Sequence, residues 1–271
     1  MANDELTASR EWALAGASKV PATITGVFWA AKLCSTALGE ATSDWWVHGF
    51  GAPVAVVLGG LVFLVALLAQ LSARRYLPWL YWLCVTMVAV FGTMVADVAH
   101  VGLGIPYLVS TAALAFGLLL VFIIWQRVEH TLSIHSITSV RRELFYWAEV
   151  IMTFALGTAA GDLVATTFGL GYLASALVFA LIFAIPALGY WSGRMEVVFA
   201  FWFAYVFTRP VGASVADWLV KPADVSGMGW AYGPVVAVLL AALVVTVGIQ
   251  QHRWQRDRRR HSHRHLGPPE H

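Results

Sequence analysis

Residues 149–172 read EVIMTFALGTAAGDLVATTFGLGY, and this stretch decides the fold. Near its centre Gly157 precedes Asp162 by five residues, and a short glycine-containing turn follows the apolar segment that this pair closes. The same spacing closes three more apolar segments, in the pairs Gly39 and Asp44, Gly92 and Asp97, and Gly212 and Asp217. A carboxylate that recurs at the same depth of several apolar segments indicates an internal repeat with a function near one end.

The composition is that of a membrane protein. Of the 271 residues 59% are hydrophobic and 12% are charged, whereas soluble domains are about a quarter charged. The mean hydropathy is +0.73, and apolar runs of roughly 18 or more residues recur, each long enough to span a bilayer as a helix. The opening MANDELTASREW is too polar for a signal peptide. The two cysteines, Cys34 and Cys84, lie in apolar segments and are interpreted as core residues rather than as a disulfide or a metal site.

The hydropathy pattern predicts an all-α polytopic membrane protein with eight transmembrane helices arranged as four parallel two-helix repeats. The expected helices lie at about 20–44, 52–71, 78–100, 106–126, 144–166, 171–190, 195–219 and 230–251. The repeats then cover about 20–71, 78–126, 144–190 and 195–251, within a transmembrane domain at 20–251.

The distribution of Lys and Arg predicts the orientation. One set of connections carries the basic residues, and the opposite set is short and nearly free of them, apart from a longer loop with Lys221. Basic residues near helix ends stay in the cytoplasm. Both the N-terminal segment (1–19) and the basic, His-rich tail (252–271) are therefore expected in the cytoplasm, and the four Gly–Asp motifs at the outer face.

The polar residues predict which helices are central. They lie on the first, third, fifth and seventh helices, whereas the helices between these are almost purely apolar. We therefore expect the four polar helices inside and the apolar helices toward lipid. Residues four apart share a helix face, so Glu40, Thr93 and Thr158 each lie on the face of the aspartate that follows them.

The charges at membrane depth predict two ion pairs and one cation site. Lys32 and Glu149 lie at similar depth on the first and fifth helices and are expected to form a buried bridge. Arg209 lies near the level of Glu40 and is expected to compensate it. This leaves the four motif aspartates without fixed partners, because His100 offsets only part of their charge. Four nearby carboxylates protonate in part or bind a cation.

Simpler readings stand beside these. The aspartates are alternatively solvated residues at helix ends, and the glycine-rich outer turns resemble channel filters only weakly. His130 and His135 in the central inner loop are not expected to bind metal or haem. The tail is interpreted as a disordered basic segment near anionic lipid, with a metal-sensing tail as the alternative.

Residues 133–172, SIHSITSVRRELFYWAEVIMTFALGTAAGDLVATTFGLGY, resemble a bacterial family of repeat membrane proteins to which no reaction is assigned. The similarity extends over most of the eight-helix region. The resemblance implies the repeat fold and a location in the bacterial inner membrane, and it implies no activity.

These observations predict a membrane transporter or channel for a cation. Clustered carboxylates suit a divalent metal ion better than K⁺ or Na⁺, and transport could be coupled to protons. The expected metal ligands are Asp44, Asp97, Asp162, Asp217, Glu40 and His100. The alternative is a non-transporting scaffold or subunit with a structural ion site.

No enzyme motif is recognised, so an enzyme is not expected. No cofactor is expected beyond a divalent metal ion as substrate or ligand. The expected partners are the lipid bilayer and the cation, with a homo-oligomer compatible with the sequence and no nucleic acid.

Overall fold

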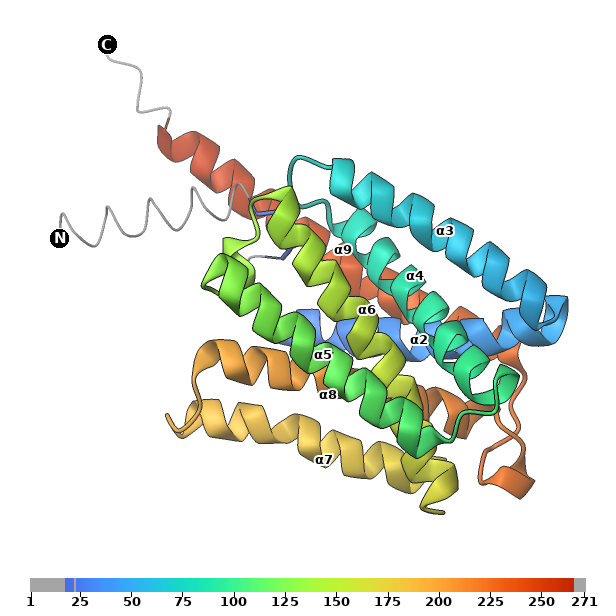
Figure 1. Ribbon diagram of the computed structural model, residues 1–271. Helices are drawn as coiled ribbons and strands as arrows, with labels where there is room; N and C mark the ends of the chain where they lie inside the picture. The colour runs from blue at the N-terminus through green and yellow to red at the C-terminus, as the bar shows by residue number, and fades with distance from the viewer. Residues whose placement is uncertain (1–17, 22, 266–271) are drawn as a thin grey trace, which may run out of the picture.

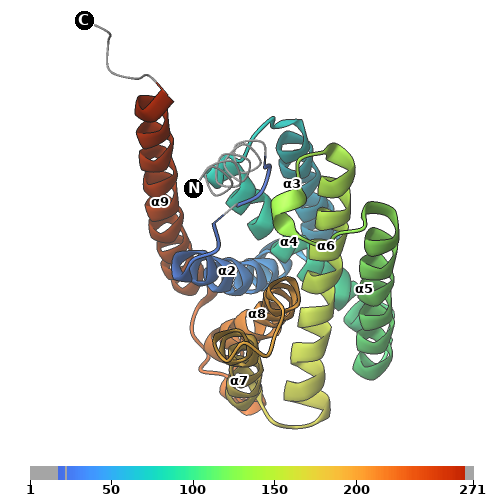
Figure 2. The same cartoon turned by 90° about the vertical axis from the view of Figure 1, so that its left-hand side faces the viewer.

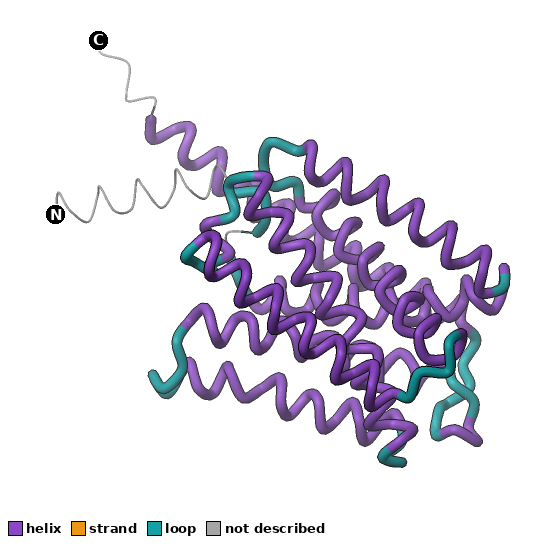
Figure 3. Tube along the Cα trace, viewed as in Figure 1, coloured by secondary structure: helices purple, strands orange, loops and turns teal. Residues whose placement is uncertain are grey.

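The computed structural model describes the backbone of residues 18–21 and 23–265, and side chains up to residue 256. Most of the N-terminal segment expected at 1–19, and the tail residues 266–271, lie outside the described residues. Figure 3 shows that the described chain is built from helices joined by short loops. The long helices are α2 (Gly26–Phe50), α3 (Ala52–Ser72), α4 (Pro78–Asp97), α5 (Tyr107–Glu129), α6 (Val140–Asp162), α7 (Tyr172–Trp191), α8 (Val197–Val220) and α9 (Tyr232–His265).

Eight long helices in the described chain confirm the predicted fold class. Seven of them, α3 to α9, are long and apolar enough to cross a membrane. The remaining helix, α2, is equally long but carries three charged residues, Lys32, Glu40 and Asp44. Large apolar side chains are exposed along the other helices, for example Leu61 on α3 and Leu181 on α7. A surface of this kind is stable in lipid rather than in water.

The predicted division into inner and outer helices is confirmed. In the apolar stretch of α4 61% of the residues are buried, against 17% in that of α5. Figure 2 shows α5, α7 and α9 at the periphery, around α2, α4, α6 and α8. Each outer helix packs mainly on the inner helix of the following repeat: α3 on α4, α5 on α6, α7 on α8, and α9 back on α2. The last contact closes the four repeats into a ring.

Backbone conformation explains the glycines of the outer turns, which are the loops at the aspartate end of the bundle. Gly51 and Gly171 directly precede α3 and α7, with φ of 78° and 74°. This left-handed region is readily adopted only by glycine, so the chain can reverse within a few residues. The glycine-rich turns that weakly resemble channel filters are therefore explained by tight helix connections.

Two element boundaries differ from the sequence prediction. Helix α2 begins at Gly26 rather than near residue 20, and an extended segment that includes Lys19 precedes it. Helix α9 continues to His265, beyond the expected end near residue 251, and projects from the bundle (Figure 1). The first part of the tail is therefore helical rather than disordered. A helix that is already formed extends at low cost through Gln and Arg, which are good helix formers.

Candidate functional site

The motif glycines allow the inner helices to approach closely. A methyl group on Gly39 of α2 would overlap Ala89 of α4, and one on Gly92 of α4 would lie 2.9 Å from Cβ of Phe154 on α6. The same relation joins the other helices, from Gly157 on α6 to Arg209 on α8 and from Gly212 on α8 back to Thr36 on α2. Each glycine thus faces the residue eight positions before the aspartate of the next repeat. Contacts that repeat in this cyclic order give the ring approximate fourfold symmetry.

A cluster of charged and hydroxyl groups fills the centre of this ring. The Arg209 guanidinium is fully buried and donates from Nη2 to Glu40 Oε2 at 2.6 Å. It also donates from Nη2 to Thr158 Oγ1 at 2.7 Å and to Thr93 Oγ1, and from Nη1 to the Thr36 carbonyl at 3.0 Å. We call Glu40, Thr93, Thr158 and Arg209 the axial cluster. The predicted pairing of Arg209 with Glu40 is confirmed.

The axial cluster takes one residue from each inner helix. Glu40, Thr93 and Thr158 occupy the same repeat position, four residues before the motif aspartates. The fourth repeat has Ala213 there, and the long side chain of Arg209, one turn earlier on α8, fills the space. Charge-assisted hydrogen bonds to all three other inner helices stabilise the ring and close its centre.

Lys221 supplies one positive charge that two of the four motif aspartates share. Its Nζ lies 2.6 Å from Asp44 Oδ2 and 3.7 Å from Asp217 Oδ1. Burial alone would lower the pKa of Lys221, but the carboxylates of Asp217 and Asp44 outweigh this effect and hold that pKa above its usual value. The expectation that all four aspartates lack a fixed partner was therefore wrong. Lys221 lies in the outer loop after α8, and sequence depth alone does not show that this loop folds back over the ring.

Asp97 and Asp162 have no such partner. Neither carboxylate forms an ion pair with a described residue. Both interact electrostatically with the carboxylates of Glu40 and Asp44 and, without an ion pair, with Lys221, and Asp162 also interacts with the Tyr107 hydroxyl. Both are partly exposed. The aspartates of the second and third repeats therefore remain available for a cation.

The backbone changes at these same two aspartates. Helix α4 ends at Asp97 and α6 at Asp162, and a single π-helical turn follows each, at Val98–Gly102 and Leu163–Thr167. Helices α2 and α8 instead continue as α-helix beyond their aspartates. Turns of this type often occur at functional sites. Asp97 and Asp162 thus differ from Asp44 and Asp217 in backbone as well as in charge.

The six expected metal ligands do not form one preassembled centre. Among the residues with described side chains, no three His, Cys, Asp or Glu groups lie close enough to hold a metal ion. His100 is turned toward the outer loop, where its Nδ1 lies 2.7 Å from the Ile105 carbonyl and its ring stacks on Tyr107. Glu40 is engaged by Arg209. The structure thus brings the carboxylates into one region but not into one coordination sphere.

Three tyrosines beside the carboxylates were missed in the sequence. Tyr107, Tyr172 and Tyr232 are the first residues of α5, α7 and α9. Tyr107 interacts with Asp162, Tyr172 with Asp217 and Tyr232 with Asp44, so each lies beside the aspartate of the next repeat. The signal was present in their shared position after three of the four outer turns, since α3 begins with Ala52 instead. It became interpretable only when the cyclic order of the helices was known.

The expected bridge between Lys32 and Glu149 is not formed, and that prediction was wrong. Both side chains are fully buried, but no ion pair joins them, and within the described chain Lys32 Nζ has no hydrogen-bond partner. The ammonium instead lies 4.0 Å and 3.9 Å from the ring centroids of Phe154 and Tyr205. Helices α2 and α6 are diagonal in the ring, and Thr158 reaches Glu40 across this diagonal at 3.3 Å, but the Lys32 ammonium lies against the aromatic rings instead of reaching Glu149.

The buried charges at the inner end are paired. Glu143 Oε2 lies 2.7 Å from Lys19 Nζ, and Glu143 Oε1 accepts a hydrogen bond from Gln70 Nε2 at 3.0 Å. Glu129 Oε2 lies 2.7 Å from Arg142 Nε, and Glu129 also contacts Arg141. These contacts tie the inner loops to α3, α5 and α6, so we assign them to stability.

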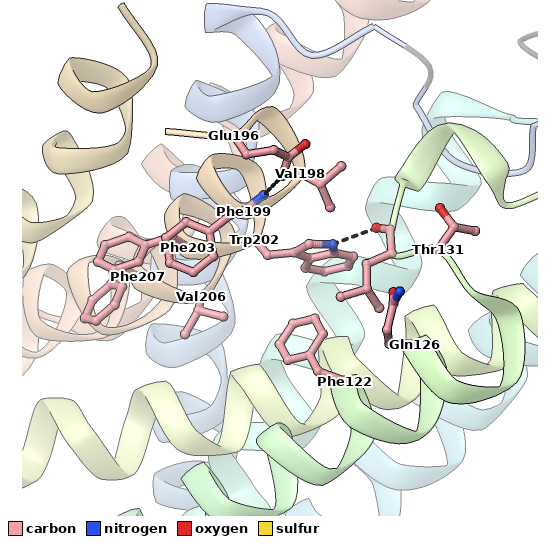
Figure 4. A pocket seen from close by; sticks show the side chains of 11 residues that line it. Phe122, Gln126, Thr131, Glu196, Val198, Phe199, Trp202, Phe203, Val206 and Phe207 are labelled. Atoms are coloured by element: carbon pink, nitrogen blue, oxygen red, sulfur yellow. Dashed lines mark hydrogen bonds between the residues drawn. The ribbon is translucent and has the colours of Figure 1, made fainter. Parts of the chain in front are cut away.

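A lateral groove of about 640 Å³ lies between α5 and α8, away from the axial cluster (Figure 4). The Trp202 indole crosses it and donates to the Leu132 carbonyl at 2.8 Å. Its lining is mostly aromatic and aliphatic and consists of Phe122, Gln126, Thr131, Leu132, Glu196, Val198, Phe199, Trp202, Phe203, Val206 and Phe207. None of the axial or outer carboxylates lines it, so the groove is separate from the candidate site.

Comparison with known proteins identifies the repeat. No protein of curated function and no solved structure matches the chain. A family described as "Repeat of Unknown Function (DUF347)" matches four segments, at 27–76, 80–131, 145–194 and 200–255. Each segment holds one inner and one outer helix, in agreement with the four repeats of the structure. The chain therefore belongs to this DUF347 repeat family.

Proposed function

We propose that this protein is a membrane transporter that moves a cation along the axis of the inner-helix ring. The observation that carries the proposal is the pair of unneutralised carboxylates, Asp97 and Asp162, at one end of that axis. Ionisable groups inside membrane segments are expensive and commonly mark ion pathways. In this proposal the two carboxylates attract the cation and supply its first ligands.

The axial cluster favours a carrier over an open pore. Arg209 contacts Glu40, Thr93 and Thr158 and fills the ring just below the outer aspartates. A fixed positive charge at this point opposes the passage of a cation. Transport then requires the guanidinium to move or its interactions to be exchanged.

A divalent metal ion remains the favoured substrate class, because clustered carboxylates suit hard divalent cations. The carboxylates are near one another without being preassembled. A loose arrangement of this kind fits a substrate that is bound and released, and the ion would draw in further ligands as it binds.

The orientation and the membrane belong to the same proposal. The Lys and Arg residues flank the inner ends of the helices, for example Arg74, Arg127 and Arg194. By the positive-inside rule both termini would lie in the cytoplasm and the aspartates at the outer face of a bacterial inner membrane.

Flux measurements in proteoliposomes test the proposal. Purified protein would be assayed with Mn²⁺, Co²⁺, Ni²⁺, Zn²⁺ and Mg²⁺, and with K⁺ and Na⁺, under an imposed pH gradient. We expect Asp97→Asn and Asp162→Asn to abolish the flux while the protein stays folded, because each keeps its shape and loses its charge. Asp224→Asn is the matched control, since Asp224 is an exposed aspartate of the outer loop.

The alternative is a membrane scaffold or subunit with a structural ion site. It predicts no flux of any cation through the wild-type protein, or a flux that both substitutions leave unchanged. Either result would overturn the transport proposal.

A further inference from the structure

Two buried charged side chains lie deeper in the ring than the axial cluster and take no part in it. Lys32 on α2 and Glu149 on α6 both have no exposed surface. Glu149 Oε1 accepts a hydrogen bond from Thr153 Oγ1 at 2.6 Å, whereas Oε2 has no partner in the described part of the chain. An unpartnered oxygen on a buried carboxylate is costly unless the group binds something, such as a proton, at some stage.

Lys32 is close enough to influence Glu149 without holding it. The two groups interact electrostatically, but they form no ion pair. Its ammonium is placed between the faces of Phe154 and Tyr205, an arrangement that stabilises a buried cation without neutralising it. In a structural salt bridge both carboxylate oxygens would have partners. Here the carboxylate keeps one oxygen free beside a positive charge.

Three tyrosine hydroxyls form a chain between this pair and the inner end, and Glu149 Oε2 has no hydrogen bond to any of them in the described structure. The Tyr205 hydroxyl lies 3.2 Å from that of Tyr146, which lies 2.6 Å from that of Tyr81. All three tyrosines are almost fully buried. A narrow, mainly apolar crevice lies over Tyr81 and Tyr146, next to Ile134 in the segment between α5 and α6, and it is too small to hold a water molecule in this structure. Hydroxyl groups in hydrogen-bonding contact both donate and accept protons.

We propose that Glu149 is the proton-carrying residue of this transporter, with Lys32 as the positive charge that controls it. The inference rests on the proposed cation transport and identifies its coupling ion. In this proposal a proton from the inner side passes along the tyrosine hydroxyls to Glu149 Oε2, which becomes a neutral carboxylic acid. The last transfer requires a side-chain rearrangement, because Oε2 has no hydrogen bond to a tyrosine in the described structure. When the proton leaves, the carboxylate is restored beside Lys32. The groups that face Glu149 are Lys32 from α2, Tyr205 from α8, and Tyr146 and Thr153 from its own helix.

Proton and cation movement measured together test this assignment. Proteoliposomes that contain a pH-sensitive dye would report protons, and a labelled cation would report transport. For Glu149→Gln we expect loss of proton movement, while exchange of labelled for unlabelled cation persists. Tyr146→Phe should slow proton movement, and the control Tyr76→Phe should not, because Tyr76 is buried against Tyr81 but lies outside the hydroxyl chain. A Glu149→Gln protein with the wild-type ratio of protons to cations would overturn the inference and leave the transport proposal standing.

Infrared titration of the purified protein provides a readout independent of transport. We expect a protonated carboxylic acid band that titrates with pH, is absent in Glu149→Gln and titrates at a different pH in Lys32→Met. If Glu149→Gln does not fold, the Lys32→Met, Glu149→Gln double variant removes both charges and serves in its place. Absence of any titrating band assigned to Glu149 would overturn the inference. A wild-type protein that moves no cation would overturn the transport proposal, and the coupling role would fall with it.

Discussion

The first and fourth repeats hold their outer aspartates differently from the second and third. Asp44 and Asp217 share the ammonium of Lys221, whereas Asp97 and Asp162 have no basic partner among the described residues. The helices of the first pair run on past the aspartate, and those of the second pair change to a π-helical turn. Four equivalent sequence positions have therefore separated into one pair that shares a lysine and one pair without an ion pair.

The difference shows how equivalent positions of a symmetric repeat take different roles. Four equivalent carboxylates would repel one another, and a cation would have no preferred position among them. A single lysine in one loop forms ion pairs only with the aspartates of α2 and α8, so the negative charge is less compensated between α4 and α6. The approximate symmetry supplies the scaffold, and the departures from it supply the site.

The largest expected effect comes from the axial cluster that supports both pairs. Arg209→Met leaves the Glu40 carboxylate buried without a partner, so we expect a loss of about 3–5 kcal/mol in stability. Denaturation of the purified protein in mixed micelles measures it. Adding Glu40→Gln should recover part of the loss. Equal stability of the single and double variants would show that the two side chains are not coupled.

The motif glycines should differ between the two sides of the ring. A methyl group on Gly212 meets Thr36 and, at 2.8 Å, the backbone nitrogen of Ala37, whereas one on Gly92 meets Cβ of Phe154 at 2.9 Å. The overlap at Gly212 is the deeper one, because Cβ of Thr36 would also lie at 2.6 Å, whereas the next atoms at Gly92 lie at 3.5 Å. We expect Gly212→Ala to destabilise by about 1–3 kcal/mol and Gly92→Ala to destabilise less, measured as unfolding midpoints. The reverse order would contradict the described helix contacts.

Removing Lys221 should make the two pairs alike. For Lys221→Met we expect a stability loss of about 1 kcal/mol, because the lysine is partly exposed, and tighter cation binding at the outer face, because two more carboxylates are freed. The folded pKa of Lys221 lies above its unfolded value. The stability that it contributes is therefore fully present below the unfolded pKa of about 10.4 and is lost only as pH rises through the higher folded pKa. The difference from wild type should stay constant between about pH 7 and pH 9, and a difference that vanishes in that range would contradict the ion pair.

The smallest expected effect is the direct coupling of Lys32 with Glu149. The two charges interact without forming an ion pair, so the stability of the double variant Lys32→Met, Glu149→Gln should depart from the sum of the single changes by only about 1 kcal/mol. Arg209 and Glu40 should depart from additivity by more. A coupling between Lys32 and Glu149 as large as that of Arg209 and Glu40 would indicate a closed bridge.

The sequence was sufficient for features that depend on position along one helix. The four repeats, the inner and outer helices and the contact of Arg209 with Glu40 follow from hydropathy and from counting residues back from each aspartate. The sequence was insufficient for contacts that depend on the order of the helices around the ring. Lys32 and Glu149 have equal depth, but the Lys32 ammonium lies against the rings of Phe154 and Tyr205. Three of the four outer helices begin with a tyrosine that lies beside the aspartate of the next repeat. Lys221 was missed because the path of a loop is not encoded in a periodic pattern.

The most direct test compares the two pairs in one assay of cation flux into proteoliposomes. One protein carries Asp97→Asn and Asp162→Asn. The other carries Asp44→Asn, Asp217→Asn and Lys221→Met, so that the two aspartates that share a lysine are removed together with that lysine. We expect the first protein to lose cation flux and the second to retain most of it. Flux that survives in the first protein and is lost in the second would contradict the account.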